Sequence, residues 1–182
     1  MASKRGKQTA RDMFLSMAVI TAVAGSVYIF IPQNKDADPV PAVDYRVELL
    51  TARRAAPYPV AAPDGLAGGW KATSVSYDRK AGNSWHLGFL DPDGKYVAVE
   101  QSTSPAKRYV TEVSQKAADT GRTRQVAGEA WQHWEGDKYD ALVRQDKGST
   151  TVVTGSASTE RLAEMAAALK TAAASPTPSP SS

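Results

Sequence analysis

The chain has 182 residues, of which 42% are hydrophobic and 23% are charged, and its formal net charge is +3. Residues 1–12 hold four basic side chains and one acidic side chain, so the rest of the chain is close to neutral and gives no argument for a nucleic-acid partner. Cysteine is absent, which excludes disulfides, thiolate metal sites, a cysteine nucleophile and a lipid-modified cysteine.

An uncharged segment at 13–32, MFLSMAVITAVAGSVYIFIP, follows this basic stub. As a helix it would rise roughly 30 Å, the thickness of a bilayer's hydrocarbon core, so it predicts a transmembrane helix. The hydroxyls of Ser16, Thr21 and Ser26 are expected to bond to the helix backbone. Because the basic residues precede the segment, we expect a single-pass protein of the cell membrane, with 1–12 cytoplasmic and the C-terminal domain extracellular.

A cleaved signal peptide is the competing interpretation, because Ala22-Val23-Ala24 has the small-x-small form of a cleavage site. Cleavage after Ala24 would leave a mature chain that starts at Gly25 with an apolar end and no folding role for it. A retained anchor uses those residues, with Tyr28 near the outer interface and Pro32 ending the helix. We therefore expect the segment to be retained.

The remainder of the chain divides into three parts. Residues 33–42 are polar and contain proline, which indicates a short extended spacer. Residues 43–172 are enough for one hydrophobic core, and we expect a single extracytoplasmic domain there. Residues 173–182 are rich in proline and serine and have nothing apolar to bury, so we expect a disordered tail.

The first half of this domain predicts one helix and three strands. A helix is expected over 43–56, with Val43, Val47, Leu50 and Ala55 at the spacing of one apolar helix face, and the three prolines that follow end it. Alternation of apolar and polar residues then predicts strands. They lie at 70–77, 84–90 and 95–101, and the tight turn Asp91–Gly94 makes the last two antiparallel.

The second half begins with a helix predicted over 104–118, with Ser104 as its N-cap and Pro105 in its first turn. Its apolar face consists of Tyr109, Val110 and Val113. Four further short strands and a closing helix follow. The strands are predicted at 122–126, 129–135, 139–145 and 149–155, and the helix at 159–173, capped by Ser158, with a stripe of Leu162, Met165, Ala166 and Leu169.

These elements predict an α+β fold in which the transmembrane helix precedes an antiparallel β-sheet domain with helices packed on one face. The strands form two blocks separated by a helix. Whether the blocks are duplicated halves stays open.

Few residues suggest chemistry. The two histidines, His86 and His133, lie in predicted strands, and a metal site would require both to converge with a carboxylate such as Glu100 or Glu135. Strand alternation explains their positions without a ligand. We therefore predict no catalytic, cofactor-binding or metal-binding residue.

The four tryptophans are the most suggestive apolar set. Trp70 and Trp85 are expected in the core. Trp131 and Trp134 fall on alternate faces of one strand, so one of the two is expected to be partly exposed. Together with His133, this pair is the candidate partner-binding surface.

The order of these segments resembles a known family. The segments VDYRVELLTARRAAPYPVAAPDGLAGGWKATSVSYD, WHLGFLDPDGKYVAVEQS and TVVTGSASTERLAEMAAAL are similar to the family called domain of unknown function 4245, found in actinobacteria as single-pass membrane-anchored proteins. The resemblance covers most of 43–169. It implies the same location and fold, and it implies no catalytic residue.

Two functional hypotheses follow. The first is a non-enzymatic binding or scaffold module in the cell envelope, anchored to the membrane, which binds an envelope protein or lipid through Trp131, His133 and Trp134. The alternative is an envelope hydrolase or transferase that uses His86 or His133 with a carboxylate.

Overall fold

The computed structural model describes the backbone of residues 5–30 and 41–172, and the side chains of residues 13–26 and 41–172. The chain forms two compact units, Met1–Pro39 and Val40–Ser182, which we describe separately. The predicted spacer at 33–42 lies outside the described residues except for its last two positions, and the predicted tail at 173–182 lies outside them entirely.

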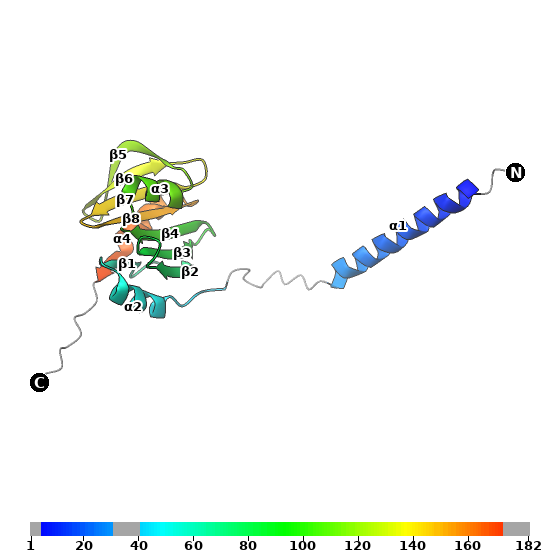
Figure 1. Ribbon diagram of the computed structural model, residues 1–182, viewed down its shortest axis with the longest axis horizontal. Coiled ribbons are helices and arrows are strands. Elements are labelled where there is room, and N and C mark those ends of the chain that lie inside the picture. Colours follow the sequence, from blue (N-terminus) through cyan, green and yellow to red (C-terminus); the bar gives the residue numbers. More distant parts are fainter. Residues whose placement is uncertain (1–4, 31–40, 173–182) are drawn as a thin grey trace, which may run out of the picture. The chain divides into compact units, whose positions relative to one another are not determined.

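The described part of the first unit is the helix α1 (Arg5–Phe30), drawn in blue in Figure 1. Thr21 Oγ1 donates to the carbonyl of Met17 at 2.9 Å and Ser26 Oγ to that of Ala22 at 2.8 Å, as predicted. Among the described residues, no helix combines the length and hydropathy that a membrane crossing requires. This corrects the transmembrane helix predicted at 13–32.

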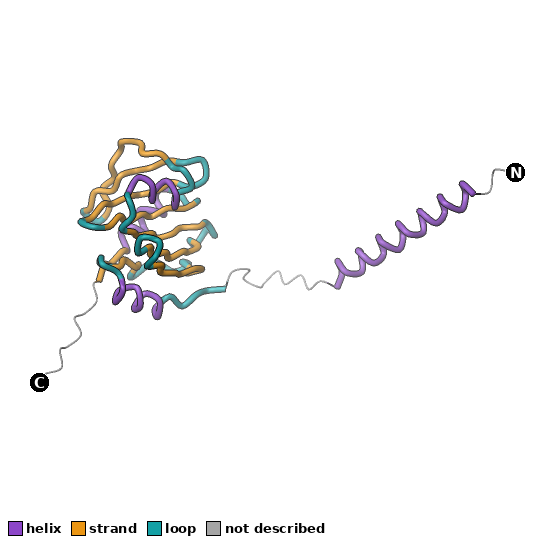
Figure 2. Tube along the Cα trace, in the orientation of Figure 1, coloured by secondary structure: helices purple, strands orange, loops and turns teal. Residues whose placement is uncertain are grey.

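The second unit contains a seven-stranded antiparallel sheet with the strand order β2-β3-β4-β8-β7-β6-β5. Three strands form a first block and four form a second, and the blocks meet where β4 pairs with β8 (Figures 1 and 2). All seven predicted strands are present, which confirms the α+β class with an antiparallel sheet. They are β2 (Lys71–Asp78), β3 (Ser84–Leu90), β4 (Tyr96–Ser102), β5 (Ala118–Val126), β6 (Glu129–Glu135), β7 (Asp140–Asp146) and β8 (Ser149–Gly155).

The turn between β3 and β4 is the one that the sequence predicts. The backbone N–H groups of Asp93 and Lys95 donate to Asp91 Oδ1 at 2.9 and 2.7 Å. Gly94 adopts a φ of +72°, a conformation that glycine reaches without steric cost. The turn fixes the β3–β4 register, in which His86 lies directly opposite Glu100.

A separate two-stranded sheet joins β1 (Val60–Pro63) to β9 (Leu169–Ala172) in antiparallel pairing. Both strands correct the prediction. The proline-rich stretch after the first helix was predicted only to end that helix, and the last helix was expected to continue to 173, whereas α4 (Thr159–Ala168) ends just before β9. Pairing between segments so distant in sequence overrides the helical pattern at Leu169 and Lys170. The predicted cap is confirmed, because Ser158 Oγ accepts a hydrogen bond from the N–H of Arg161 at 3.3 Å.

Hydrophobic cores lie on both faces of the seven-stranded sheet. The larger core packs α2 (Arg46–Ala55), α4 and β1 against residues such as Trp85, Leu142 and Val153. The smaller core packs α3 (Ala106–Val113) against the opposite face, where Tyr109 and Val110 are buried. Figure 1 shows α3 and α4 on opposite sides of the sheet. The prediction that helices pack on one face is therefore wrong, because strands such as β8 bury alternate side chains on both faces.

Two helices also differ from the prediction in detail. In α2 the buried residues are Leu49 and Ala52, whereas Val47 and Leu50, predicted to face inward, are 72% and 54% exposed. The predicted helix at 104–118 is shorter, because α3 ends at Val113 and is capped by Pro105 without a side-chain hydrogen bond rather than by Ser104.

Candidate functional site

Three polar side chains lie side by side on the α3 face of the sheet. Strand alternation directs Trp85 and Leu87 into the larger core, so His86 between them points to the opposite face. Glu100 lies opposite His86 on β4, and Ser74 lies opposite Gly88 on β2, just after a β-bulge. We call Ser74, His86 and Glu100 the Ser–His–Glu row.

Hydrogen bonds connect the row from end to end. Ser74 Oγ lies 2.8 Å from His86 Nε2, and His86 Nδ1 lies 2.6 Å from Glu100 Oε1. From α3, the Tyr109 hydroxyl donates to Glu100 Oε2 at 3.3 Å and to the carbonyl of Gln101 at 3.1 Å. The side chain of Glu100 is 10% exposed and that of His86 is 26% exposed, so the acid is almost enclosed and the imidazole is reachable by solvent.

The electrostatics of the row favour a charged pair. Burial lowers the pKa of His86, but the hydrogen bond and the negative charge of Glu100 outweigh burial and raise that pKa above its ordinary value. Burial is the largest cause that raises the pKa of Tyr109, and the charge of Glu100 adds to it. Tyr109 is therefore a neutral donor to Glu100 at physiological pH.

Tyr96 reaches the same part of the sheet face. A Cβ atom built at Gly88 would lie 3.1 Å from the Tyr96 hydroxyl and closer still to Ser74 Oγ. The missing side chain thus allows the hydroxyls of Ser74 and Tyr96 to approach one point. Burial, reinforced by the charge of Glu100, raises the pKa of Tyr96 to about 12, so its phenol also keeps its proton.

The second histidine is separate from the row. His133 lies on β6, and three strands, β4, β8 and β7, separate β6 from β3. Its Nδ1 lies 3.6 Å from Glu135 Oε1, and its Nε2 is buried without a hydrogen-bond partner among the described residues. The two histidines do not converge, and the part of the chain that the structure describes holds no group of three or more possible metal ligands.

The tryptophans of the predicted binding surface are both buried. Trp131 is 1% exposed in the larger core and Trp134 is 7% exposed in the smaller core, so the expectation that one is partly exposed is wrong. Both faces of the sheet are covered at β6, so side chains that point to either face are buried. Trp131, His133 and Trp134 therefore do not form a shared accessible surface. Trp70 and Trp85 do contact the core as predicted, with Trp85 fully buried and Trp70 partly buried.

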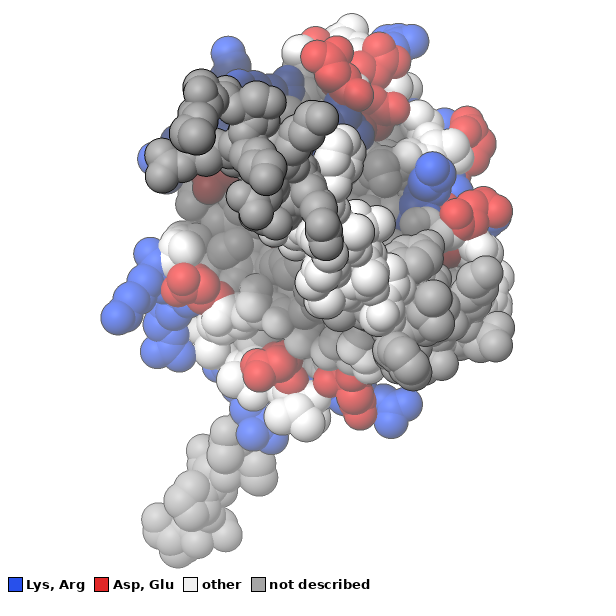
Figure 3. Space-filling view, turned by 90° about the vertical axis from the view of Figure 1, so that its right-hand side faces the viewer, with Lys and Arg blue, Asp and Glu red and all other residues white. Residues whose placement is uncertain are grey.

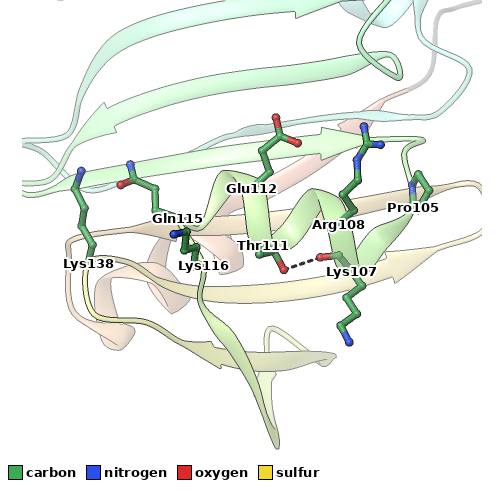
Figure 4. A pocket seen from close by; sticks show the side chains of 8 residues that line it. All are labelled: Pro105, Lys107, Arg108, Thr111, Glu112, Gln115, Lys116 and Lys138. Carbon is green, nitrogen blue, oxygen red and sulfur yellow. Dashed lines mark hydrogen bonds between the residues drawn. The ribbon is translucent and has the colours of Figure 1, made fainter.

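A basic groove lies along the outer side of α3, with a volume of about 1070 Å³. Figure 4 shows Lys138, from the loop between β6 and β7, beside the C-terminal end of α3, and Arg108 and Lys107 directed to opposite sides of that helix. Gln115 and Lys116, just after the helix, have positive φ angles of 54° and 80°. We call this site the α3 groove; its lining consists of Pro105, Lys107, Arg108, Thr111, Glu112, Gln115, Lys116 and Lys138.

The charges of the α3 groove are not neutralised by the rest of the domain. Four basic side chains and one acidic side chain line it, and none of them forms an ion pair with a residue that the structure describes. On the face shown in Figure 3, by comparison, acidic and basic side chains are interspersed, as a near-neutral composition predicts. The groove is therefore a local excess of positive charge on a balanced surface.

The sequence suggested His86 with a carboxylate only as an alternative hypothesis, and it predicted neither the complete row nor the α3 groove. The turn between β3 and β4 was predicted, and extending its register places His86 opposite Glu100, so that contact could have been found. Ser74 could not have been placed, because the bulge before it changes the β2–β3 register. The α3 groove depends on the β6–β7 loop lying beside α3, which no local pattern indicates.

No curated protein matches the chain. One family does match, over residues 5–169, and it is described as "Protein of unknown function (DUF4245)". That range includes nearly every described residue, with the Ser–His–Glu row and the α3 groove within it. The chain belongs to this family of unknown function.

Proposed function

We propose that this protein is a binding module whose α3 groove holds an acidic segment of a partner protein. The observation that carries the proposal is the set of four basic side chains that have no ion-pair partner among the described residues. Positive charge left uncompensated on an otherwise balanced surface attracts a partner of opposite charge and orients its approach. This replaces the tryptophan surface expected from the sequence.

The lining favours an acidic protein segment over other anions. It contains no aromatic side chain on which a base could stack. Lys107, Arg108 and Lys116 are all exposed, and they lie on α3 or just after it rather than being directed at one point as in a phosphate site. Because Lys107 and Arg108 are directed to opposite sides of α3, a peptide with several carboxylates would lie across the helix to meet both, while the carbon stems of the lysines pack against the peptide.

A charge-reversal experiment tests this proposal. The probe is a fluorescent glutamate-rich peptide titrated with the full chain at low and at physiological salt. Reversing three groove cations is expected to weaken binding at least about tenfold, since each lost contact also adds a repulsion. The matched control reverses three exposed lysines elsewhere and changes the net charge equally, so it is expected to keep most of the affinity. The groove variant is K107E/R108E/K116E, and the control is K80E/K95E/K147E.

Two results would contradict the proposal. Equal loss of binding in the groove variant and its control would show that net charge alone attracts the peptide. Binding of inorganic polyphosphate with no binding of the peptide would show that the groove selects phosphates rather than carboxylates.

A further inference from the structure

The Ser–His–Glu row has the connectivity of a nucleophilic triad. In such a triad a hydroxyl bonds to Nε2 of a histidine whose Nδ1–H is held by a carboxylate. Here the two contacts measure 2.8 and 2.6 Å, both within normal hydrogen-bond distance. The three side chains come from three adjacent strands, which makes their spacing a property of the sheet rather than of a mobile loop.

A purely structural role accounts for only part of this arrangement. Glu100 is nearly buried and needs hydrogen bonds, which His86 and Tyr109 supply. Ser74 is not required for that purpose, since it lies on the edge strand β2 and is only half-buried. A bulge lies immediately before it, and bulges commonly redirect side chains beside functional sites.

The neighbourhood of Ser74 also contains a hydrogen-bond donor for a developing negative charge. Ser74 Oγ and the Tyr96 hydroxyl both adjoin the point that a Cβ atom of residue 88 would occupy, because Gly88 has none. The phenol of Tyr96 keeps its proton well above neutral pH, because burial raises its pKa to about 12. A carbonyl carbon attacked by Ser74 would therefore have its oxygen within reach of the Tyr96 O–H, which can act as an oxyanion donor.

We infer that the Ser–His–Glu row, together with Tyr96, is a catalytic site that hydrolyses small carboxylic esters. Ser74 on the edge strand β2 is half-buried and the side chain of His86 is 26% exposed, so the row suits a short acyl group rather than an extended substrate. This activity is independent of the α3 groove, and a failure of either proposal leaves the other standing.

The reaction has two balanced halves. In the first, Ser74 Oγ bonds to the ester carbonyl carbon and its proton passes to His86 Nε2. The carbon–oxygen bond of the ester then breaks, and the leaving alkoxide takes that proton and departs as an alcohol. In the second half, a water gives a proton to Nε2 and its oxygen bonds to the acyl carbon. The bond from Ser74 Oγ breaks, Ser74 regains the proton, and a carboxylic acid leaves.

The full chain can be tested with a fluorophosphonate probe and with p-nitrophenyl acetate. We expect covalent labelling at Ser74 and a release of p-nitrophenol that Ser74→Ala abolishes. The matched control is Ser76→Ala, because Ser76 lies on the same face of β2, opposite His86, and is exposed. Tyr96→Phe should retain labelling and lower the rate at least about tenfold, as loss of an oxyanion donor does.

The pH profile separates a general base from a structural histidine. Four groups face or adjoin His86: Glu100 and Ser74 in the row, and Tyr96 and Tyr109 beside it. Glu100 raises the pKa of His86. A base must be unprotonated, so the rate should rise with pH through a value above the ordinary histidine pKa of about 6.5. In Glu100→Gln that midpoint should move to lower pH.

Cysteine substitution gives a readout that does not require ester turnover. The chain has no cysteine, so Ser74→Cys and Ser76→Cys each introduce a single thiol. Ser74 Oγ lies 2.8 Å from His86 Nε2, so a thiol at position 74 should react with iodoacetamide at neutral pH at least about tenfold faster than a thiol at position 76, because a hydrogen-bonded imidazolium stabilises a thiolate. Equal alkylation rates in the two variants, or labelling of the native chain that survives Ser74→Ala, would overturn the inference.

Discussion

At the scale of single residues, buried polar groups of this domain differ in whether they have partners. His86 is bonded through both ring nitrogens, and Trp85 Nε1 donates to the carbonyl of Ala61 at 3.0 Å. Trp134 Nε1 and His133 Nε2 are buried without a partner among the described residues. Because an unpaired buried donor costs more than a paired one, these side chains should respond differently to conservative substitution.

The two buried tryptophans provide a matched test of that difference. Trp85→Phe removes a hydrogen bond and leaves the carbonyl of Ala61 without its donor, whereas Trp134→Phe removes a donor that had no partner. Both substitutions delete the same atoms, so the cavity cost is similar. We expect Trp85→Phe to lower the free energy of unfolding by about 1–2 kcal/mol more than Trp134→Phe, as measured by urea denaturation. Equal losses would contradict the hydrogen-bond assignment.

The His86–Glu100 contact predicts a dependence of stability on pH. The folded-state pKa of His86 is raised above its unfolded value, so the folded state binds the proton more tightly. The contribution of the charged pair is then fully present below the unfolded pKa, about 6.5, and is lost as pH rises through the higher folded pKa. The free energy of unfolding should fall across that window.

Urea denaturation at a series of pH values measures this effect, and Glu100→Gln supplies the control. Without the carboxylate the fall should shrink or disappear. A native protein whose stability rises over the same window would show that His86 is held in its neutral form.

At the scale of elements, the faces of helix α2 are the sharpest difference between expectation and structure. Its apolar residues are compatible with more than one inward face. Contacts with β1 and β2 decide whether Leu49 or Leu50 points inward. Ala52 is 0% exposed, and Val47 is 72% exposed. The side chain at position 52 is therefore enclosed by its neighbours.

Two single substitutions distinguish the observed face from the predicted one. Ala52→Leu adds three carbons to a filled site and should cost about 1–3 kcal/mol of unfolding free energy. Val47→Lys places a charge in solvent and should change that free energy by less than about 0.5 kcal/mol. Thermal or urea denaturation of both variants measures these changes. A larger loss of unfolding free energy for Val47→Lys than for Ala52→Leu would show that Val47, and not Ala52, lies on the buried face of α2.

At the scale of the whole molecule, local patterns specified the seven strands and the class of the fold but not how the layers are assembled. Alternation and turn residues suffice for each hairpin, as with Asp91–Gly94. The pairing of β1 with β9, the position of α3 and the burial of both Trp131 and Trp134 all depend on contacts between segments far apart in the chain. Such contacts leave little local signal, which is why β9 was predicted as the end of a helix.

The candidate sites likewise combine contacts that local sequence patterns predict with contacts between distant segments. The β3–β4 contact of His86 with Glu100 is local and was within reach of the sequence, while Ser74 and Lys138 join their sites through a bulge and a distant loop. The net charge of the domain gave no hint of the α3 groove, because its cations are balanced by acids elsewhere on the surface. The structure shows a local excess of positive charge that the total charge of the domain does not reveal.

Backbone amide NMR of the full chain during titration with the glutamate-rich peptide tests the central claim most directly. If the α3 groove is the binding site, the largest chemical-shift changes should fall on residues of α3, on Gln115 and Lys116 and on Lys138, and K107E/R108E/K116E should remove them. Shift changes centred on the opposite face of the sheet, or equally strong changes in the charge-reversed variant, would contradict the assignment of the groove as the binding site.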